Sequence, residues 1–129
     1  MEWHIKGDRP IYAQLVDHIK HFIVSGHLQP GSKLPSVRDM AQDASVNPNT
    51  MQKALSMLDE EGLLLPQSTT GRYITRDLEL INQTRTRIAE EKIQTVIREL
   101  FALGYAPEEV LRIFTVLMED TMAATADRR

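Results

Sequence analysis

Along the first part of the chain, segments with a helical spacing of apolar residues alternate with residues that favour turns. Between about residues 10 and 25, apolar side chains recur at intervals of three and four, which predicts an amphipathic helix. Gly26 stands where this helix should end, and Pro30-Gly31 favours a turn. A second, shorter helix is predicted over about residues 36–44.

A third helix is predicted to begin at Pro48, because Asn47 is a good N-cap and proline loses no helical hydrogen bond at the first position. Four apolar residues with the spacing i, i+3, i+4 and i+7 are expected to form its buried side: Met51, Ala54, Leu55 and Leu58. Two apolar runs, at residues 63–66 and 72–74, then flank a polar tip at residues 67–71. This arrangement predicts a β-hairpin.

The second part of the chain has no Gly or Pro between Thr75 and Gly104, which predicts one long helix with Gly104 as its C-cap. A further helix is predicted from Pro107. Two helices bury too little surface to form a core alone, so their apolar stripes are predicted to form a dimer interface. The residues of the two stripes are Ile93, Val96, Ile97, Leu100, Phe101, Val110, Leu111, Phe114, Leu117 and Met118.

Three short helices followed by a hairpin have the element order of a winged helix-turn-helix. The predicted fold class is therefore mainly α with a small β-hairpin wing. Residues 1–75 are predicted to form a winged helix-turn-helix DNA-binding domain, and residues 76–129 a helical dimerisation domain. In this architecture the recognition helix enters the major groove, and its N-terminal residues contact base edges.

The third helix has polar residues with the chemistry of base recognition on the side opposite its apolar stripe. The amides of Asn49 and Gln52 can form two hydrogen bonds with adenine, and Lys53 can reach guanine or phosphate. Arg38, early in the second helix, is a further candidate for guanine or phosphate. From the pattern alone, a merely solvated helix side is an equally good interpretation.

Composition limits the class of function. Of the 129 residues, 42% are hydrophobic and 26% are charged, as in ordinary globular proteins, and no apolar run is long enough to cross a membrane. The net charge of −3 lacks the basic excess common among nucleic-acid binders, so DNA binding must depend on local arrangement. The start of the chain lacks an apolar signal-peptide core, so a cytoplasmic location is expected.

Other candidate sites have simpler explanations. His18 and His21 lie three residues apart on the first helix, but no third ligand is evident, so no metal site is predicted. The acidic residues 59–61 end a helix and are expected to be solvated rather than catalytic. No nucleophile–base pair, phosphate-binding loop or cofactor motif occurs, so no enzyme and no cofactor are predicted. Trp3 is expected to pack the N-terminal arm onto the fold.

Five short blocks occur in order: Pro10-Ile11-Tyr12-Ala13-Gln14-Leu15, Gly26-His27-Leu28-Gln29-Pro30-Gly31, Leu34-Pro35-Ser36-Val37-Arg38, Val46-Asn47-Pro48-Asn49-Thr50 and Leu58-Asp59-Glu60-Glu61-Gly62. Together they resemble the DNA-binding domain of the GntR family of bacterial transcription factors. The short remainder, with two predicted helices, resembles the YtrA-like branch of that family, whose tail serves mainly for dimerisation.

This resemblance implies DNA contacts from the start of the second helix, from the recognition helix and from the wing tip. Together with Gln52, which is included for its chemistry, the implied contact residues are Ser36, Arg38, Pro48, Asn49, Thr50, Lys53, Thr69, Thr70 and Gly71. Thr69 stands where the family usually has the first glycine of a Gly-x-Gly sequence.

The resemblance further implies a homodimeric, sequence-specific transcriptional regulator, with repression at an inverted-repeat operator as the expected mode. The expected partners are double-stranded DNA and a second copy of the chain. A small-molecule effector stays open, since no residue pattern names a ligand. The alternative function is a winged-helix protein-interaction module. An affinity for duplex DNA that falls steeply with salt would separate the two hypotheses.

Overall fold

The computed structural model of the chain describes residues 1–67 and 69–126. Contacts divide the chain into two compact units, with the boundary between Arg87 and Ile88. Ser68, within the predicted hairpin tip, lies outside the described residues. No helix in the described part of the chain is both long and apolar enough to cross a membrane.

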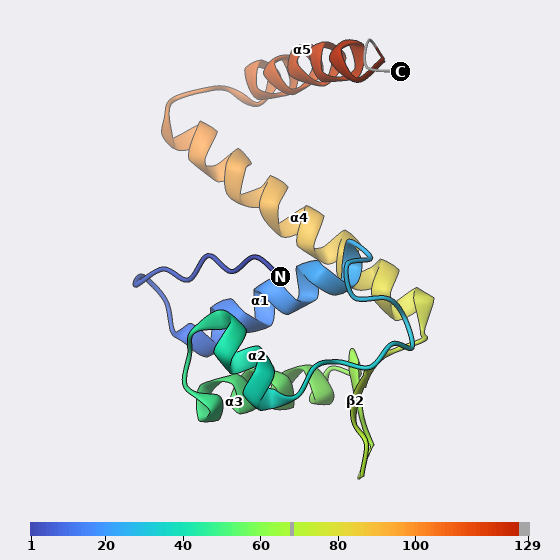
Figure 1. Cartoon of the computed structure of the whole chain (residues 1–129). Helices are drawn as coiled ribbons and strands as arrows, with labels where there is room; N and C mark the ends of the chain where they lie inside the picture. The colour runs from blue at the N-terminus through green and yellow to red at the C-terminus, as the bar shows by residue number, and fades with distance from the viewer. Residues whose placement is uncertain (68, 127–129) are drawn as a thin grey trace. The chain divides into compact units, whose positions relative to one another are not determined.

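Three short helices lie in the first unit (Figure 1). They are α1 (Ile11–Val24), α2 (Val37–Ala44) and α3 (Pro48–Glu60). The predicted ranges of the first two helices are confirmed to within one residue at each end. The predicted start of α3 is also confirmed, because the Asn47 side chain accepts a hydrogen bond from the Asn49 backbone N–H at 2.7 Å.

A serine in the left-handed conformation makes the turn between α2 and α3. Ser45 has a φ of 56°. The backbone N–H groups of Ser45 and Val46 donate to the carbonyls of Gln42 and Ala41. These two bonds satisfy carbonyl groups at the end of α2 and reverse the chain sharply into α3.

One apolar core lies among the three helices and the base of the hairpin. The residues predicted for the inner side of α3 are all fully buried in it: Met51, Ala54, Leu55 and Leu58. The other elements contribute further fully or almost fully buried side chains, which include Leu15, Ile19, Ile23, Met40, Leu63, Leu64 and Ile74. Burial of this apolar surface fixes the rotation of α3 about its own axis, so the polar side of the helix is turned outward.

The hairpin pairs β1 (Leu64–Gln67) with β2 (Gly71–Ile74) in antiparallel orientation. Leu64 lies opposite Ile74, and Gln67 lies opposite Gly71. The predicted hairpin is confirmed, but Gln67 and Gly71, which were predicted for the tip, form the outermost pair of the ladder. Gly71 has a φ of 102°, a conformation that glycine adopts more easily than other residues.

The segment of residues 32–34 lies along the other edge of β2. The Leu34 N–H donates to the Arg72 carbonyl at 2.8 Å, and the Ile74 N–H donates to the Ser32 carbonyl at 2.9 Å. Strand β2 is therefore hydrogen-bonded on both edges. The wing is attached in this way to the chain that leads into α2.

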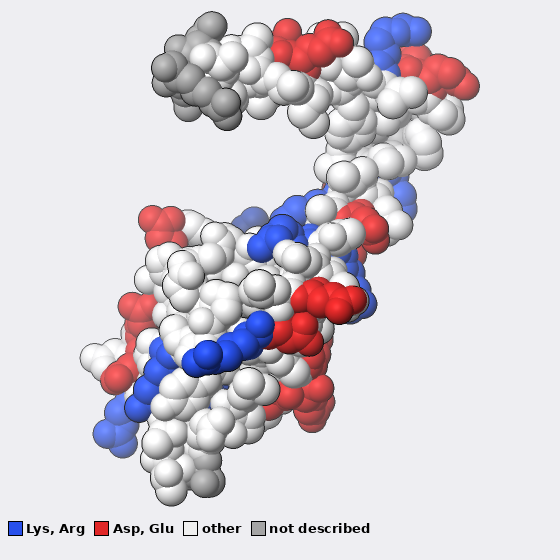
Figure 2. Space-filling model, turned by 90° about the vertical axis from the view of Figure 1, so that its right-hand side faces the viewer, with Lys and Arg blue, Asp and Glu red and all other residues white. Residues whose placement is uncertain are grey.

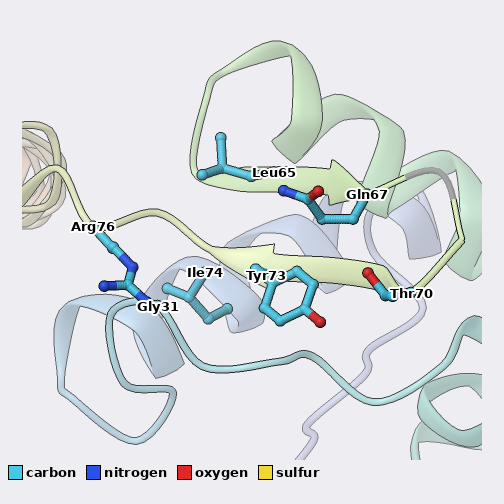
Figure 3. A pocket seen from close by; sticks show the side chains of 7 residues that line it. All are labelled: Gly31, Leu65, Gln67, Thr70, Tyr73, Ile74 and Arg76. Carbon is cyan, nitrogen blue, oxygen red and sulfur yellow. The ribbon is translucent and has the colours of Figure 1, made fainter.

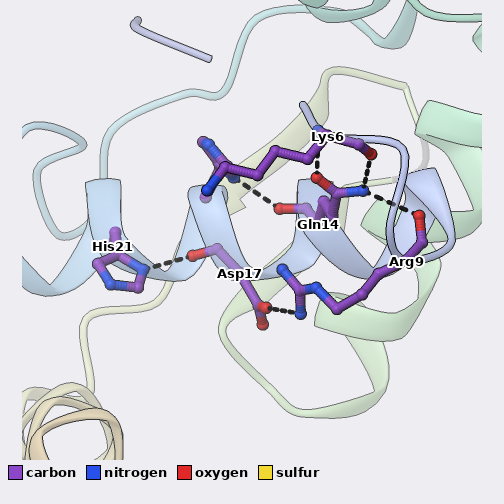
Figure 4. Close-up of polar contacts among 6 residues, drawn as sticks. Lys6, Arg9, Gln14, Asp17 and His21 are labelled. Atoms are coloured by element: carbon purple, nitrogen blue, oxygen red, sulfur yellow. Dashed lines mark hydrogen bonds and ion pairs between the residues drawn. The ribbon is translucent and has the colours of Figure 1, made fainter. Parts of the chain in front are cut away.

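Gln14 fixes the N-terminal arm, residues 1–9, to α1 (Figure 4). Its side chain is buried, accepts a hydrogen bond from the Lys6 N–H at 2.7 Å, and donates to the carbonyls of Lys6 and Arg9 at 2.6 and 2.9 Å. A buried amide costs free energy unless its hydrogen bonds are made. Here they are made, so the arm and the helix depend on each other.

Trp3 packs the arm onto the fold as predicted. Its ring meets the edge of Phe22 at a centroid distance of 5.3 Å and stacks on His18 at 5.8 Å. Its indole N–H donates to the Asp43 carboxylate on α2 at 2.8 Å. One aromatic side chain thus joins the arm to both α1 and α2.

The long helix α4 (Leu78–Ala102) begins a few residues after Thr75. The Thr75 hydroxyl accepts from the Asp77 N–H, and the Asp77 carboxylate accepts from the Leu80 N–H, both at 3.1 Å. Asp77 therefore caps the first turn of α4, which explains why the helix begins at Leu78.

The first turns of α4 belong to the first compact unit. Ile81 is buried in the core. The guanidinium of Arg85 donates twice to the carbonyl of Val24, at 3.0 and 2.8 Å. Val24 is the last residue of α1, and its carbonyl has no partner within the helix, so Arg85 satisfies it.

The predicted C-cap of α4 is confirmed. Gly104 has a φ of 98°. Its N–H donates to the Phe101 carbonyl at 2.9 Å, and the Tyr105 N–H donates to the Leu100 carbonyl at 3.3 Å. These are the two bonds of a Schellman motif. The last helix, α5 (Pro107–Ala126), begins at the predicted proline.

In the second unit, most of the apolar side chains predicted for dimerisation lie exposed in the single chain. Val110 is buried, and Ile97 and Leu100 are half-buried. The other seven are exposed: Ile93, Val96, Phe101, Leu111, Phe114, Leu117 and Met118. Exposure of so many neighbouring apolar side chains is unfavourable in water.

Candidate DNA-binding surface

Helix α3 turns its polar side to solvent at its N-terminal end. The predicted contact residues of this helix are all exposed except the half-buried Thr50, and the exposed ones are Pro48, Asn49, Gln52 and Lys53. This arrangement confirms the predicted division of α3 into a core side and a polar side. Contact of the polar side with DNA stays a prediction.

Lys53 lies against α1 through an interaction that the sequence analysis did not predict. Its ammonium nitrogen is 3.8 Å from the centroid of the Tyr12 ring, which is a cation–π geometry. Tyr12 is half-buried and lies in the first turn of α1. The N-terminal end of α1 therefore lies next to the polar side of α3.

The start of α2 carries the next two predicted contact residues. Ser36 and Arg38 are both exposed. The Ser36 hydroxyl accepts a hydrogen bond from the Asp39 N–H at 3.1 Å, as expected for the serine half of a capping box. In this role the hydroxyl oxygen is an acceptor, and its own hydrogen can still be donated to a phosphate oxygen.

The described wing-tip residues Thr69, Thr70 and Gly71 are all exposed. Contact of these tip residues with DNA stays a prediction.

The wing tip and the start of α2 line one pocket of about 620 Å³. Ser36 lines the pocket at the start of α2, and Thr70 and Gly71 line it from the wing. Lys33 lines it from the segment before α2 that pairs with β2. The structure therefore brings two of the three predicted groups of contact residues to the same pocket. The polar residues of α3 do not line it.

The acidic end of α3 differs in part from the prediction of a solvated helix end. The Asp59 carboxylate pairs with Arg72 of β2 at 3.0 Å, and Asp59 is only 19% exposed. Glu61 pairs with Lys20 of α1 at 3.1 Å. Both partners are far away in sequence, so the local charge pattern could not predict these pairs.

Charged side chains of both signs lie on the side of the molecule that Figure 2 shows. The Lys and Arg side chains lie there in separate groups, with Asp and Glu side chains near them, and they do not cover the whole side. This distribution agrees with the net charge of −3. Any attraction to DNA must come from a few basic side chains at particular positions.

A second pocket, of about 310 Å³, lies beside the wing (Figure 3). Tyr73 of β2 and Arg76, which follows that strand, line it together with Leu65 and Gln67 of β1. The Arg76 guanidinium also lies close to Gly31, where an added Cβ would be 2.8 Å from Nε. Gly31 also has a φ of 78°, so a residue with a side chain would be strained at this position even if Arg76 moved.

The two histidines of α1 use ring nitrogens in bonds to the backbone. Nδ1 of His18 is 2.8 Å from the Gln14 carbonyl, and Nδ1 of His21 is 2.7 Å from the Asp17 carbonyl. Nε2 of His18 accepts the N–H of His4 at 3.0 Å. These bonds give the histidines of α1 structural roles.

The fold and this surface define a winged helix-turn-helix protein, in which the outward side of α3, the start of α2 and the wing tip belong to one unit. Residues 11–74 match the model of the bacterial regulatory proteins of the gntR family. The transcriptional repressor YtrA of Bacillus subtilis is 34% identical over 99 residues, which are 75% of this chain and 76% of YtrA. The chain belongs to the GntR family of DNA-binding transcriptional regulators and is not an enzyme.

Two solved structures support the fold and the family. A GntR-family transcriptional regulator from Listeria monocytogenes superposes with a TM-score of 0.80 at 34% identity, over 86% of this chain and 97% of that one. The DNA-binding domain of AraR in complex with its operator ORX1 superposes with a TM-score of 0.54 at 28% identity, over 58% of this chain and 96% of that one. These similarities confirm the predicted winged helix with two C-terminal helices and the resemblance to short YtrA-type regulators.

Proposed function

We propose that this regulator is a homodimer that represses transcription by occupying an inverted-repeat operator. The observation that carries the proposal is the polar, solvent-facing N-terminal end of α3, since the buried apolar side of the helix fixes its orientation. The name of the similar repressor YtrA and the operator complex of the AraR domain support it.

In the proposed complex, α3 lies in the major groove. The amides of Asn49 and Gln52 bond to adenine edges, while Lys53 and Arg38 reach guanine or phosphate. Ser36 and the tip residues Thr69–Gly71 contact the backbone on either side of the groove and set the register of the domain. These contacts are local, which makes the proposal compatible with an acidic chain.

The proposed homodimer covers the exposed apolar side chains of α4 and α5. Seven of the ten predicted interface residues are exposed in the single chain. A second copy offers an identical apolar surface, and twofold symmetry pairs each surface with its equivalent. The same symmetry presents two copies of α3 to the DNA, and for this reason we expect the operator to be an inverted repeat.

A titration of the purified full chain tests the proposal. The DNA is taken from upstream of the chain's own gene, with a scrambled duplex of equal length as control, at two salt concentrations. We expect tight binding to the first duplex and weak, strongly salt-dependent binding to the second. If the protein binds the upstream duplex no better than the scrambled one, a selection from random duplexes supplies the operator. If that selection also yields no preferred sequence, the proposal is wrong and the protein-interaction function is favoured.

A further inference from the structure

One ion pair joins the wing to the recognition helix. Arg72 lies on β2, and Asp59 lies in the last turn of α3. The Arg72 Nε–H donates to both carboxylate oxygens, at 3.0 and 3.1 Å. The two side chains are only 16% and 19% exposed, so water screens their attraction less than it screens a pair on the open surface.

Arg72 lies on β2 at the point where the buried base of the wing ends. Side chains alternate along a strand, so Arg72 lies on the same side of β2 as Ile74. Ile74 and its partner Leu64 are fully buried at the base of the wing. The next pair outward on this side is Pro66 and Arg72, and Pro66 is exposed. Apolar packing therefore holds the base of the wing, and the ion pair holds the next part of the wing, toward the tip, to α3.

We propose that Asp59 is a positioning residue for operator binding, which holds Arg72 and so fixes the direction of the wing tip relative to α3. Arg72 directly follows Gly71, the last residue of the tip, and the pair thus acts next to the candidate DNA contacts. The inference rests on the proposed function, because it requires α3 and the wing tip to contact the same operator half-site.

Charge alone gives the opposite expectation. A carboxylate in a DNA-binding domain repels the phosphates, so its removal should raise the affinity for any duplex. A positioning role requires instead that removal of Asp59 lowers the affinity for the operator. The sign of the effect therefore separates the two roles.

The matched variants are Asp59→Asn and Glu60→Gln. Each removes one negative charge with almost no change of shape, but Glu60 is exposed and forms no ion pair within the described residues. With the full chain and its operator, Asp59→Asn should weaken binding about tenfold. Glu60→Gln should not weaken it, and the scrambled duplex should bind both variants at least as well as the wild type.

A double-mutant cycle shows whether Asp59 acts through Arg72. If it does, Arg72→Gln weakens operator binding, and the double variant loses no more than the stronger single one. If Arg72 instead bonds a phosphate by itself, Arg72→Gln lowers the salt slope by about one on every duplex and its effect adds to that of Asp59→Asn. That second result overturns the proposal.

Hydroxyl-radical footprints distinguish positioning from general loss of structure. Thr69→Asp, which places a charge on the wing tip, identifies the DNA positions that the wing protects. Asp59→Asn should lose the same positions and keep the remainder, with a thermal midpoint close to that of Glu60→Gln. Loss of all protections together with a lowered midpoint, or binding equal to that of Glu60→Gln, contradicts the inference. A wild-type chain that prefers no duplex contradicts the proposed function itself.

Discussion

The position of the Lys53 ammonium group is restricted by its contact with the Tyr12 ring. Its ammonium lies 3.8 Å from the centroid of the Tyr12 ring, so part of the entropy of ordering this long side chain is already lost before DNA arrives. An ordered cation on the polar side of α3 is well suited to a phosphate, because phosphate recognition by lysine requires a charge at a fixed place more than a directed pair of hydrogen bonds.

We therefore predict that Lys53→Gln weakens binding to operator and scrambled DNA alike. The salt slope of the binding constant should fall by about one for the loss of one phosphate contact. Titrations of both duplexes over a range of salt concentrations measure this. A loss confined to the operator would show that Lys53 contacts a base instead.

Arg38, near the start of α2, is a candidate for a contact with a base as well as with phosphate. An arginine that bonds guanine with two hydrogen bonds discriminates by roughly 1–3 kcal/mol against other bases. If Arg38 contacts a base, Arg38→Ala should lose that amount on the operator and little on scrambled DNA. If it contacts only phosphate, the loss should be similar on all sequences. Equal binding of Arg38→Ala and wild type on every duplex would show that Arg38 does not contact DNA.

At the level of elements, the turn between α2 and α3 sets the direction of α3 relative to α2. Ser45 holds this turn with a φ of 56°. A residue with a Cβ carries a conformational cost of roughly 1–2 kcal/mol in this region, and glycine does not. The protein therefore loses a little stability at the turn that leads into α3, the helix with the candidate DNA contacts.

Ser45→Gly should raise the free energy of unfolding by up to about 1 kcal/mol, because it removes this cost and keeps the two backbone bonds of the turn. Ser45→Val should lower it, since a β-branched residue is poorly accommodated at positive φ. Urea unfolding curves of the three chains provide the test. The order valine, serine, glycine is expected; a glycine variant less stable than wild type would show that the Ser45 side chain has a stabilising role of its own.

The elements that the sequence predicted best are those set by local chemistry. Asn47 and Pro48 fix the start of α3, and Gly104 fixes the end of α4, whichever other segments are nearby. The contacts that escaped prediction join residues far apart in sequence, as between Asp59 and Arg72, or Lys53 and Tyr12. Helical and strand periodicity reveals which side of an element is buried, but it carries no information about which charged residue meets which across the fold.

For the whole molecule, the key question is how the apolar residues of α4 and α5 are covered. Within α5 the predicted interface residues occupy one side of the helix at 100° per residue. Leu117 lies within that stripe and Val116 lies outside it, although both are exposed, at 58% and 50%. Two adjacent apolar residues on different sides of one helix form a matched pair for a test of the proposed dimer.

Leu117→Glu should weaken the dimer on the order of a hundredfold, because it would place an unpaired charge in the apolar interface. Val116→Glu adds the same charge next to it and should leave the dimer intact. Sedimentation equilibrium over a range of concentrations measures both. Because an inverted repeat is bound by two copies of α3 together, Leu117→Glu should also reduce the affinity for the full operator toward that for a single half-site, while Val116→Glu keeps it. Equal dissociation of both variants would place the interface elsewhere, and a monomeric wild type that still binds the full operator tightly would refute the role of the tail in dimerisation.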